Sequence, residues 1–380
     1  MPDNMSKIVK TMCLLLLTVS MYGCVHKKDK QEYITLGALL PLTGAESDEG
    51  LRAFNGLQLA KKEINESGGV MGKMIDIITL NDRGEEDYAV QQYHNLRGKG
   101  VVAIIGSSYS GVTTAIAKAS EKDGIPVISP TASDPGVTRG RKNVFRAIFT
   151  DDYQAKAMAY FAYNSLNTRN VLILINENFA SYKRAAEVFE ISFREYGGQI
   201  AAVEYYSAEE DYPGILAKYA INKPDLIFCP EDYLPAAKLI NCVHEHGFEG
   251  VYKLGTDAWD GILTYVPHPE AMKNVYYSAP FSFDDPDEDV TRFVRNYFNI
   301  FSQMPLSGSA TAYTCVYILK KAIEEAGNTN SHDIVSAMKK NVLDVITGRI
   351  QFDENNNPHT NVYVIQIDGG VYSTFEKLSL

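Results

Sequence analysis

Short apolar runs alternate with longer segments of helical periodicity from residue 33 onward. The first run covers residues 34–40, and the segment after it places Leu57, Ala60 and Ile64 on one helical face. This alternation is typical of a parallel sheet whose strands are connected by helices. The sequence therefore predicts an α/β fold.

The alternation forms two consecutive series. Strands are expected over residues 34–40, 75–80, 101–105 and 127–129 in the first series and over 171–175, 201–205, 226–229 and 251–254 in the second. Helices are expected near 85–97, 112–122, 155–166, 182–195, 212–221 and 235–246. Two such series predict two doubly wound α/β domains. A ligand would bind where the carboxyl ends of strands from both domains face each other.

The start of the chain is typical of a secretion signal. Lys7 and Lys10 precede an apolar run over residues 12–19. That run is far shorter than the roughly 20 residues that span a bilayer. We therefore expect residues 1–23 to be a signal peptide, which would place the mature protein outside the cytoplasm.

The end of this segment resembles a bacterial lipobox, because Gly23 stands directly before Cys24. The motif usually has Leu where Met21 stands and a small residue where Tyr22 stands. The resemblance implies that Cys24 is lipidated and becomes the mature N-terminus, anchored to a bacterial membrane, with residues 24–32 as a tether. Cleavage without lipidation is the alternative.

Composition narrows the class of partner. Charged residues make up 22% of the chain and apolar residues 45%, as in a soluble globular protein. Removing 23 of the 380 residues would leave 357, and the loss of two lysines and one aspartate would change the net charge from −11 to −12. An acidic body argues against a nucleic-acid partner.

Cysteine and histidine spacing predicts no metal site and no cofactor. Beyond Cys13 and Cys24 only Cys229, Cys242 and Cys315 remain, so at most one disulfide can form among them. A bridge between Cys229 and Cys242 is one reading, and isolated buried thiols are the other. His244 and His246 are two positions apart in a predicted helix and point to different faces, which argues against a shared ion.

Two loops of the first series carry hydroxyl groups just after predicted strands. Residues 106–111 contain Tyr109 and Ser110 and lead into a helix, whose N-terminal amides favour an anion such as a carboxylate. Ser110 could equally be an ordinary helix cap. Residues 129–135 contain Thr131 and Ser133, and we expect all four side chains to contact a small polar ligand.

The second series offers acidic and aromatic side chains at the corresponding places, over residues 176–182, 231–233 and 255–259. Asp257 is the strongest candidate among them for contact with a ligand. A carboxylate that faces a hydroxyl-lined carboxylate pocket would meet the ammonium group of a zwitterion, because either charge is costly to bury unpaired. A helix cap or turn residue is the alternative for Asp257.

Several of these segments together resemble the leucine/isoleucine/valine-binding proteins, which serve ABC importers. The resemblance covers roughly residues 33–375 and is carried by Pro41-Leu42-Thr43-Gly44, Asn65 with Gly68-Gly69-Val70-Met71-Gly72, Ile105-Gly106, Gly124-Ile125-Pro126-Val127-Ile128-Ser129-Pro130 and Leu254-Gly255-Thr256-Asp257. It implies a type I periplasmic binding fold that closes around an amino acid and passes it to an ABC permease. It also implies that Ser110, Thr131 and Ser133 hold the carboxylate and backbone of the ligand and that Asp257 pairs with its ammonium.

Departures from the family concern the ligand side chain. Where the family often has Tyr-Gly, this chain has Phe179-Ala180-Ser181-Tyr182, so the aromatic wall is either Phe179 or Tyr182, with Ser181 between them. Asp232, beside Tyr233, stands where the family has a second tyrosine. In the family, a position in the first loop lines the ligand side chain and is commonly aromatic or apolar. In this chain that position falls near Asp48-Glu49. An inward Glu49 or Asp232 would be unpaired against an aliphatic side chain and would favour a polar or cationic ligand.

The resemblance also implies the domain boundaries. Residues 33–150 and 281–350 would form the N-terminal lobe, and residues 151–280 and 351–380 the C-terminal lobe. Helices at 291–301 and 310–326 would belong to the first of these. Three crossings, near 150, 280 and 350, would form the hinge.

A serine hydrolase and a sensor are the two alternatives to ligand capture for import. The run Gly106-Ser107-Ser108-Tyr109-Ser110 comes within one residue of the G-x-S-x-G elbow of serine hydrolases but lacks the final glycine. No histidine lies in a convincing triad context, so we expect no enzyme. A sensor or receptor lipoprotein that binds a small amide or another amino-acid-like ligand for signalling is the remaining alternative.

Overall fold

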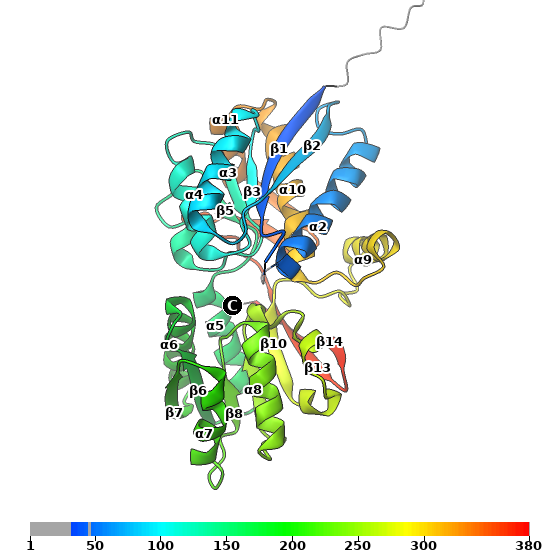
Figure 1. Cartoon of the computed structure of the whole chain (residues 1–380). Helices are drawn as coiled ribbons and strands as arrows, with labels where there is room; N and C mark the ends of the chain where they lie inside the picture. Colours follow the sequence, from blue (N-terminus) through cyan, green and yellow to red (C-terminus); the bar gives the residue numbers. More distant parts are fainter. Residues whose placement is uncertain (1–31, 45–46, 380) are drawn as a thin grey trace, which may run out of the picture.

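The computed structural model describes residues 32–44 and 47–379 (Figure 1). The expected signal peptide, Cys24 and nearly all of the expected tether lie outside these residues. Within the described residues, no helix is both long enough and apolar enough to cross a membrane. The chain forms two lobes stacked end to end, each built on its own sheet (Figure 1).

The first lobe contains a parallel five-stranded sheet in the order β2-β1-β3-β4-β5. Its strands are β1 (Tyr33–Leu40), β2 (Met74–Asn81), β3 (Ile104–Gly106), β4 (Val127–Ser129) and β5 (Val144–Arg146). The helices α2 (Ser47–Glu66), α3 (Glu86–Gly98) and α4 (Ser110–Ser120) connect the first four strands, as the periodicity predicted. β5 was not predicted, and the strand expected at 101–105 begins later, at Ile104.

The second lobe contains a seven-stranded sheet in the order β14-β13-β10-β9-β8-β6-β7. Five strands are parallel, namely β6 (Asn170–Asn176), β7 (Gln199–Tyr206), β8 (Leu226–Phe228), β9 (Tyr252–Gly255) and β10 (Val275–Ala279). β13 (Val362–Asp368) and β14 (Val371–Leu378) join antiparallel. The helices are α5 (Asp151–Tyr160), α6 (Ala180–Glu195), α7 (Tyr212–Lys218) and α8 (Tyr233–Glu245). α5 continues as a π-helical turn at Phe161–Ser165, and 3₁₀ helices of this lobe lie at Glu209–Asp211, Asp257–Trp259, Ile262–Tyr265 and Pro269–Met272. A further 3₁₀ helix, Pro135–Val137, lies between β4 and β5 in the first lobe.

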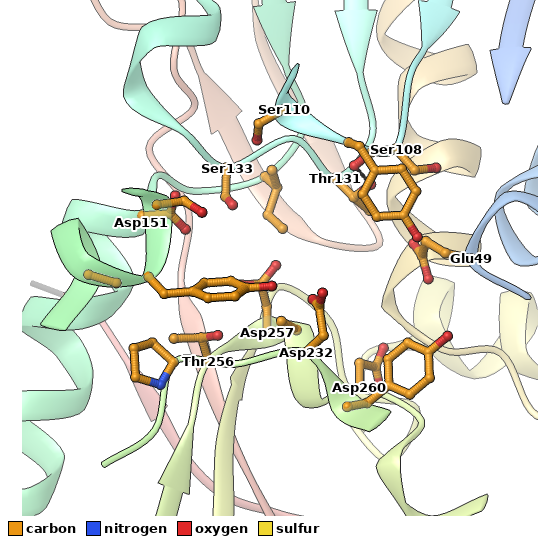
Figure 2. Close-up of a pocket in the computed structure, with 18 of the residues that line it drawn as sticks. Glu49, Ser108, Ser110, Thr131, Ser133, Asp151, Asp232, Thr256, Asp257 and Asp260 are labelled. Carbon is orange, nitrogen blue, oxygen red and sulfur yellow. Dashed lines mark hydrogen bonds between the residues drawn. The ribbon is translucent and has the colours of Figure 1, made fainter. Parts of the chain in front are cut away.

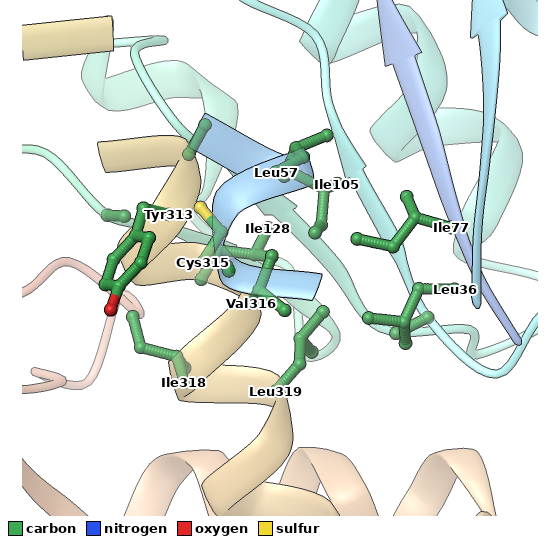
Figure 3. Packing of buried hydrophobic residues seen from close by; sticks show 14 of the residues in the cluster. Leu36, Leu57, Ile77, Ile105, Ile128, Tyr313, Cys315, Val316, Ile318 and Leu319 are labelled. Carbon is green, nitrogen blue, oxygen red and sulfur yellow. The ribbon is translucent and has the colours of Figure 1, made fainter. Parts of the chain in front are cut away.

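The chain returns to the first lobe after β10. The returning segment contains α9 (Glu288–Phe301), α10 (Ser307–Ala326), α11 (Ser331–Lys340) and a hairpin of β11 (Val342–Val345) and β12 (Gly348–Gln351). α10 packs against α2 and the sheet, with Val316 and Leu319 among the buried side chains (Figure 3). A Cβ on Gly56 of α2 would lie 2.0 Å from the Ser309 carbonyl oxygen, so only glycine allows this approach.

The final passage to the second lobe lies beyond the predicted position near 350. The Phe352 ring still packs on Phe145 of the first lobe, with centroids 5.0 Å apart. The Asn356 side-chain amide donates to the carbonyl oxygen of Val144 at 2.9 Å. The chain therefore crosses between Asn356 and the start of β13 at Val362, because side chains of this turn complete the first lobe.

The three cysteines of the described residues are free and buried, which agrees with isolated thiols rather than a bridge between Cys229 and Cys242. Burial raises the pKa of the Cys242 thiol to about 11. Nowhere from residue 32 to 44 or from 47 to 379 do three His, Cys, Asp or Glu side chains gather as a metal site would require.

Candidate functional site

A cavity of about 390 Å³ lies between the two lobes, where the carboxyl ends of both sheets meet. This volume suits a small molecule. The cavity is lined by Glu49, Ser108, Tyr109, Ser110, Gly111, Thr131, Ser133, Ile148, Asp151, Phe179, Ser181, Tyr182, Ala185, Pro230, Asp232, Tyr233, Thr256, Asp257, Ala258, Asp260, Ser307 and Gly308. The structure thus brings together all eleven side chains that the sequence singled out for ligand contact.

The first-lobe wall carries hydroxyls and free backbone amides. Ser110 and Gly111 open α4, and the first hydrogen bond into that helix runs from the Thr113 amide to the Tyr109 carbonyl. The amides before Thr113 therefore have no partner inside the helix and lie at the positive end of the helix dipole, where Ser110 and Gly111 line the cavity. The Ser108 hydroxyl also lines the cavity and, among the described atoms, has no hydrogen-bond partner. This wall can bind an anion without a basic side chain.

The neighbouring loop after β4 is held rigid from behind. The Thr131 hydroxyl donates to the Ser108 carbonyl at 2.9 Å, which ties the two hydroxyl loops together. Buried Arg146, at the end of β5, donates to the carbonyls of Ala132 and Asp134, both at 2.6 Å. Ser133 is thereby presented at the cavity from a fixed backbone, opposite Asp257 (Figure 2).

The facing wall holds a pair of carboxylates that share one amide. The Gln154 side-chain nitrogen donates to Asp257 Oδ1 at 2.7 Å and to Asp151 Oδ1 at 2.9 Å. The Gln154 oxygen accepts from the Asp257 backbone amide at 3.1 Å and from the Ser278 hydroxyl at 2.7 Å. Gln154 therefore fixes the positions of both carboxylates relative to each other.

Burial and mutual repulsion make this pair hard to ionise. Burial, reinforced by the charges of Asp151 and Glu49, raises the pKa of Asp257 to about 8. Burial raises the pKa of Asp151 to about 6, although hydrogen bonds from Ser133 and Gln154 oppose the shift. The charge of Asp151 is the second cause of the shift at Asp257, so the ionisation of one group affects the other. A ligand ammonium placed between them would restore both charges.

A second acidic region lies where α2 approaches the loop after β9. Glu49 Oε2 is 3.6 Å from the Arg52 guanidinium, and burial raises the pKa of Glu49. Asp260 accepts from the Tyr277 hydroxyl at 3.1 Å and from the Ser307 amide at 2.6 Å. Arg52 also donates to the Asp260 carbonyl at 3.3 Å. These contacts join the first lobe to the second beside the cavity.

The loop that carries Asp232 is anchored by a buried carboxylate. Glu231 Oε2 accepts from the Tyr206 hydroxyl at 2.6 Å and from the Asn176 side-chain amide at 2.8 Å. Its other oxygen accepts from the Asp232 backbone amide at 3.1 Å. Asp232 is therefore presented to the cavity by a loop whose base is fixed by the side chain of its neighbour.

Aromatic side chains form the remaining wall. The rings of Phe179 and Tyr182 lie 5.0 Å apart and both line the cavity, so either can form the aromatic wall. Ser181 lines the cavity beside them. Tyr233 stacks on Tyr265 with centroids 5.1 Å apart. Aromatic faces beside carboxylates suit a ligand that has both apolar and charged parts.

Sequence reasoning missed Asp151, Gln154, Asp260 and the start of α10. Asp151 follows a three-residue strand, which was too short to be recognised, so its loop was not read as a strand end. Thr150 before Asp151-Asp152 was a detectable signal, because it caps α5 by accepting from the Tyr153 amide. Gln154 lies one turn further along the same helix.

The two α/β lobes enclose a cavity with hydroxyls on one wall and carboxylates on the other, an arrangement that suits a small polar ligand. The model of the periplasmic binding protein family matches residues 33–371. The Leu/Ile/Val-binding protein BraC3 of Rhizobium johnstonii is 26% identical over 337 residues, with 84% of this chain and 88% of the relative covered.

Solved structures of substrate-binding proteins are also similar to this chain. The branched-chain amino acid transporter substrate-binding protein LivJ of Streptococcus pneumoniae, in complex with isoleucine, superposes with a TM-score of 0.83 at 27% identity, covering 92% of this chain and 99% of that one. A solute-binding protein of R. palustris in complex with benzoate gives 0.79 at 20% identity, covering 92% and 98%, and shows likeness of fold alone. The chain belongs to the periplasmic binding protein family. Its relatives are binding proteins rather than enzymes, which confirms the prediction against catalysis.

Proposed function

We propose that the protein is the substrate-binding component of an ABC importer and binds an amino acid in the cavity between its lobes. The observation that carries this proposal is the buried pair of Asp257 and Asp151 opposite the amides and hydroxyls at the start of α4. An amino acid has an ammonium for the first group and a carboxylate for the second. Charge-assisted hydrogen bonds of this kind suffice for a Kd of about 1 μM when the side chain is also buried.

The division into lobes supports capture by closure. We propose that residues 33–150 with 281 to about 357 form one lobe and the remaining body the other, with three crossings as the hinge. The contacts between them lie beside the cavity: the Tyr265 hydroxyl donates to Asp48 Oδ2 at 2.5 Å, and the Ser307 amide donates to Asp260. Opening about the hinge would break these few bonds and admit a ligand, and closing would exclude water.

The location and partners follow from the same proposal. The family's extracytoplasmic setting agrees with the signal peptide expected over residues 1–23, and Cys24 would anchor the protein to a bacterial membrane by lipid. An ABC permease would receive the ligand. Loss of amino-acid uptake when the gene is deleted in its native bacterium would support import, whereas intact uptake would favour the sensor alternative.

Binding itself is tested by a thermal-shift screen of the purified protein against the common amino acids, since a ligand specific to the folded state raises its Tm. Asp257→Ala should abolish the shift and remain folded, whereas Asp87→Asn, an exposed acid on α3, should keep it. No shift with any amino acid would contradict the proposal. An unchanged affinity in Asp257→Ala would remove Asp257 as the ammonium partner.

A further inference from the structure

The walls of the cavity carry more carboxyl groups than the single ammonium of an aliphatic amino acid can contact. Five carboxylate side chains line it, namely those of Glu49, Asp151, Asp232, Asp257 and Asp260. The described residues that line the cavity include no lysine or arginine. Arg52 and Arg146 lie behind the walls, where they bind Glu49 and backbone carbonyls. The ammonium of an aliphatic zwitterion can contact Asp257 and Asp151, and it does not reach the acids at the Glu49 end of the cavity.

The acids are distributed along the cavity rather than gathered at one point. Figure 2 shows Asp151 and Glu49 on opposite sides of the view, with Asp257 and Asp232 between them. Ser110 and Ser133 lie on the facing wall above Asp151 and Asp257, at the end where we place the α-carboxylate and α-ammonium. The ligand side chain would therefore extend toward Asp232 and Glu49.

An aliphatic side chain in that direction would be costly. The Glu49 side chain is only 19% exposed, and its ion pair with Arg52 is long at 3.6 Å. Closure around a hydrocarbon would remove water from this carboxylate without supplying a hydrogen-bond donor. A cationic group supplies both a charge and donors. The Tyr233 ring, which stacks on Tyr265 beside Asp48 and Glu49, can cover its methylene chain.

We propose that the cavity selects an amino acid with a positively charged side chain, with Asp232 and Glu49 as the groups that recognise that charge. This inference rests on the proposed function and specifies the ligand class of the same site. It departs from the isoleucine bound by the S. pneumoniae relative. Ser108 lines the same cavity and is 5% exposed, and its hydroxyl has no hydrogen-bond partner among the described atoms, which favours a polar ligand over a purely apolar one.

Matched ligands separate charge from shape in a calorimetric titration of the full mature protein. L-Lysine is compared with L-norleucine, which lacks only the ε-ammonium, and L-arginine with L-citrulline, which is nearly isosteric and neutral. The cationic member of at least one pair should bind tenfold or more tightly than its neutral counterpart. Equal or tighter binding of the neutral members, or of leucine and isoleucine, overturns the inference and leaves the proposed function standing. No binding by any of these ligands also overturns the inference, and the thermal-shift screen against the common amino acids then decides whether the proposed function stands.

Variants identify the recognising groups. Asp232→Asn and Glu49→Gln keep the size of each side chain and remove its charge. Each should weaken lysine or arginine binding at least fivefold and leave norleucine unchanged or tighter, whereas Asp87→Asn should change neither. The Tm without ligand reports folding, and an equal loss for cationic and neutral ligands in both variants would overturn the assignment of these residues.

Discussion

Gln154 and Asp257 make two reciprocal hydrogen bonds across more than a hundred residues of sequence. The Gln154 side chain donates to the Asp257 carboxylate at 2.7 Å and accepts from the Asp257 backbone amide at 3.1 Å. α5 thereby orients the carboxylate at the end of β9 that we expect to bind the ligand ammonium. Gln154 is a positioning residue in this account.

Gln154→Leu should weaken ligand binding by about 10- to 100-fold, because it removes roughly 1–3 kcal/mol of hydrogen bonding to a buried charged group. The variant should also leave the Ser278 hydroxyl without its partner. Calorimetric titration with the best ligand measures the loss. Gln91→Leu, at an exposed position of α3, is the matched control and should bind normally. An unchanged Kd in Gln154→Leu would show that Gln154 does not orient the site.

Ligand binding should release protons near neutral pH. With a pKa of about 8 in the empty protein, Asp257 is largely protonated at pH 7, and a bound ammonium requires it as the carboxylate. Affinity should therefore rise by up to about tenfold per pH unit between pH 6 and 8. Titrations in phosphate and in Tris should give different apparent enthalpies. Identical enthalpies at pH 7 would indicate that Asp257 is already ionised.

The stability of the ligand-free protein should fall as pH rises. The folded pKa of Asp257, about 8, lies above its ordinary value of 3.8, so folding takes up a proton between these limits. The contribution to the free energy of unfolding is full below about pH 4 and is lost progressively as pH rises to about 8. Tm should therefore decrease from pH 5 to 8.5, and Asp257→Asn should flatten this slope. The same slope in both proteins would contradict the shift.

Gly56→Ala should destabilise the first lobe, because the added Cβ would lie 2.0 Å from the Ser309 carbonyl and force α2 and α10 apart. Overpacking of this kind costs about 1–3 kcal/mol. Urea denaturation measures the loss. Gly98→Ala, at the end of α3 with no atom within 4 Å of the added Cβ, is the control and should be neutral or slightly stabilising. Equal stability of the two variants would show that the helices can separate freely.

The sequence predicted the fold well where periodicity is long. α6 and α8 lie within two residues of their predicted bounds, and every predicted strand exists. The failures have local causes. β5 has three residues and ends in a buried arginine, and the β11–β12 hairpin has no long apolar run, so neither produces a periodic signal.

The site was predictable where polar residues follow recognisable strands, as Ser110 follows β3 and Asp257 follows β9. The pairing of Asp151 with Asp257 was not, because it depends on Gln154 bridging elements far apart in sequence. The contact between Asp260 and the first turn of α10 likewise exists only when both lobes are assembled. Such relationships are properties of the assembled tertiary structure rather than of any local motif.

A crystal structure of the protein with its tightest-binding amino acid tests the central claim most directly. The account predicts that the ligand ammonium lies within hydrogen-bond distance of the Asp257 carboxylate and that the ligand carboxylate contacts Ser110 and the first amides of α4. A ligand bound in the reverse orientation, or a cavity that stays empty at saturating ligand, would contradict it.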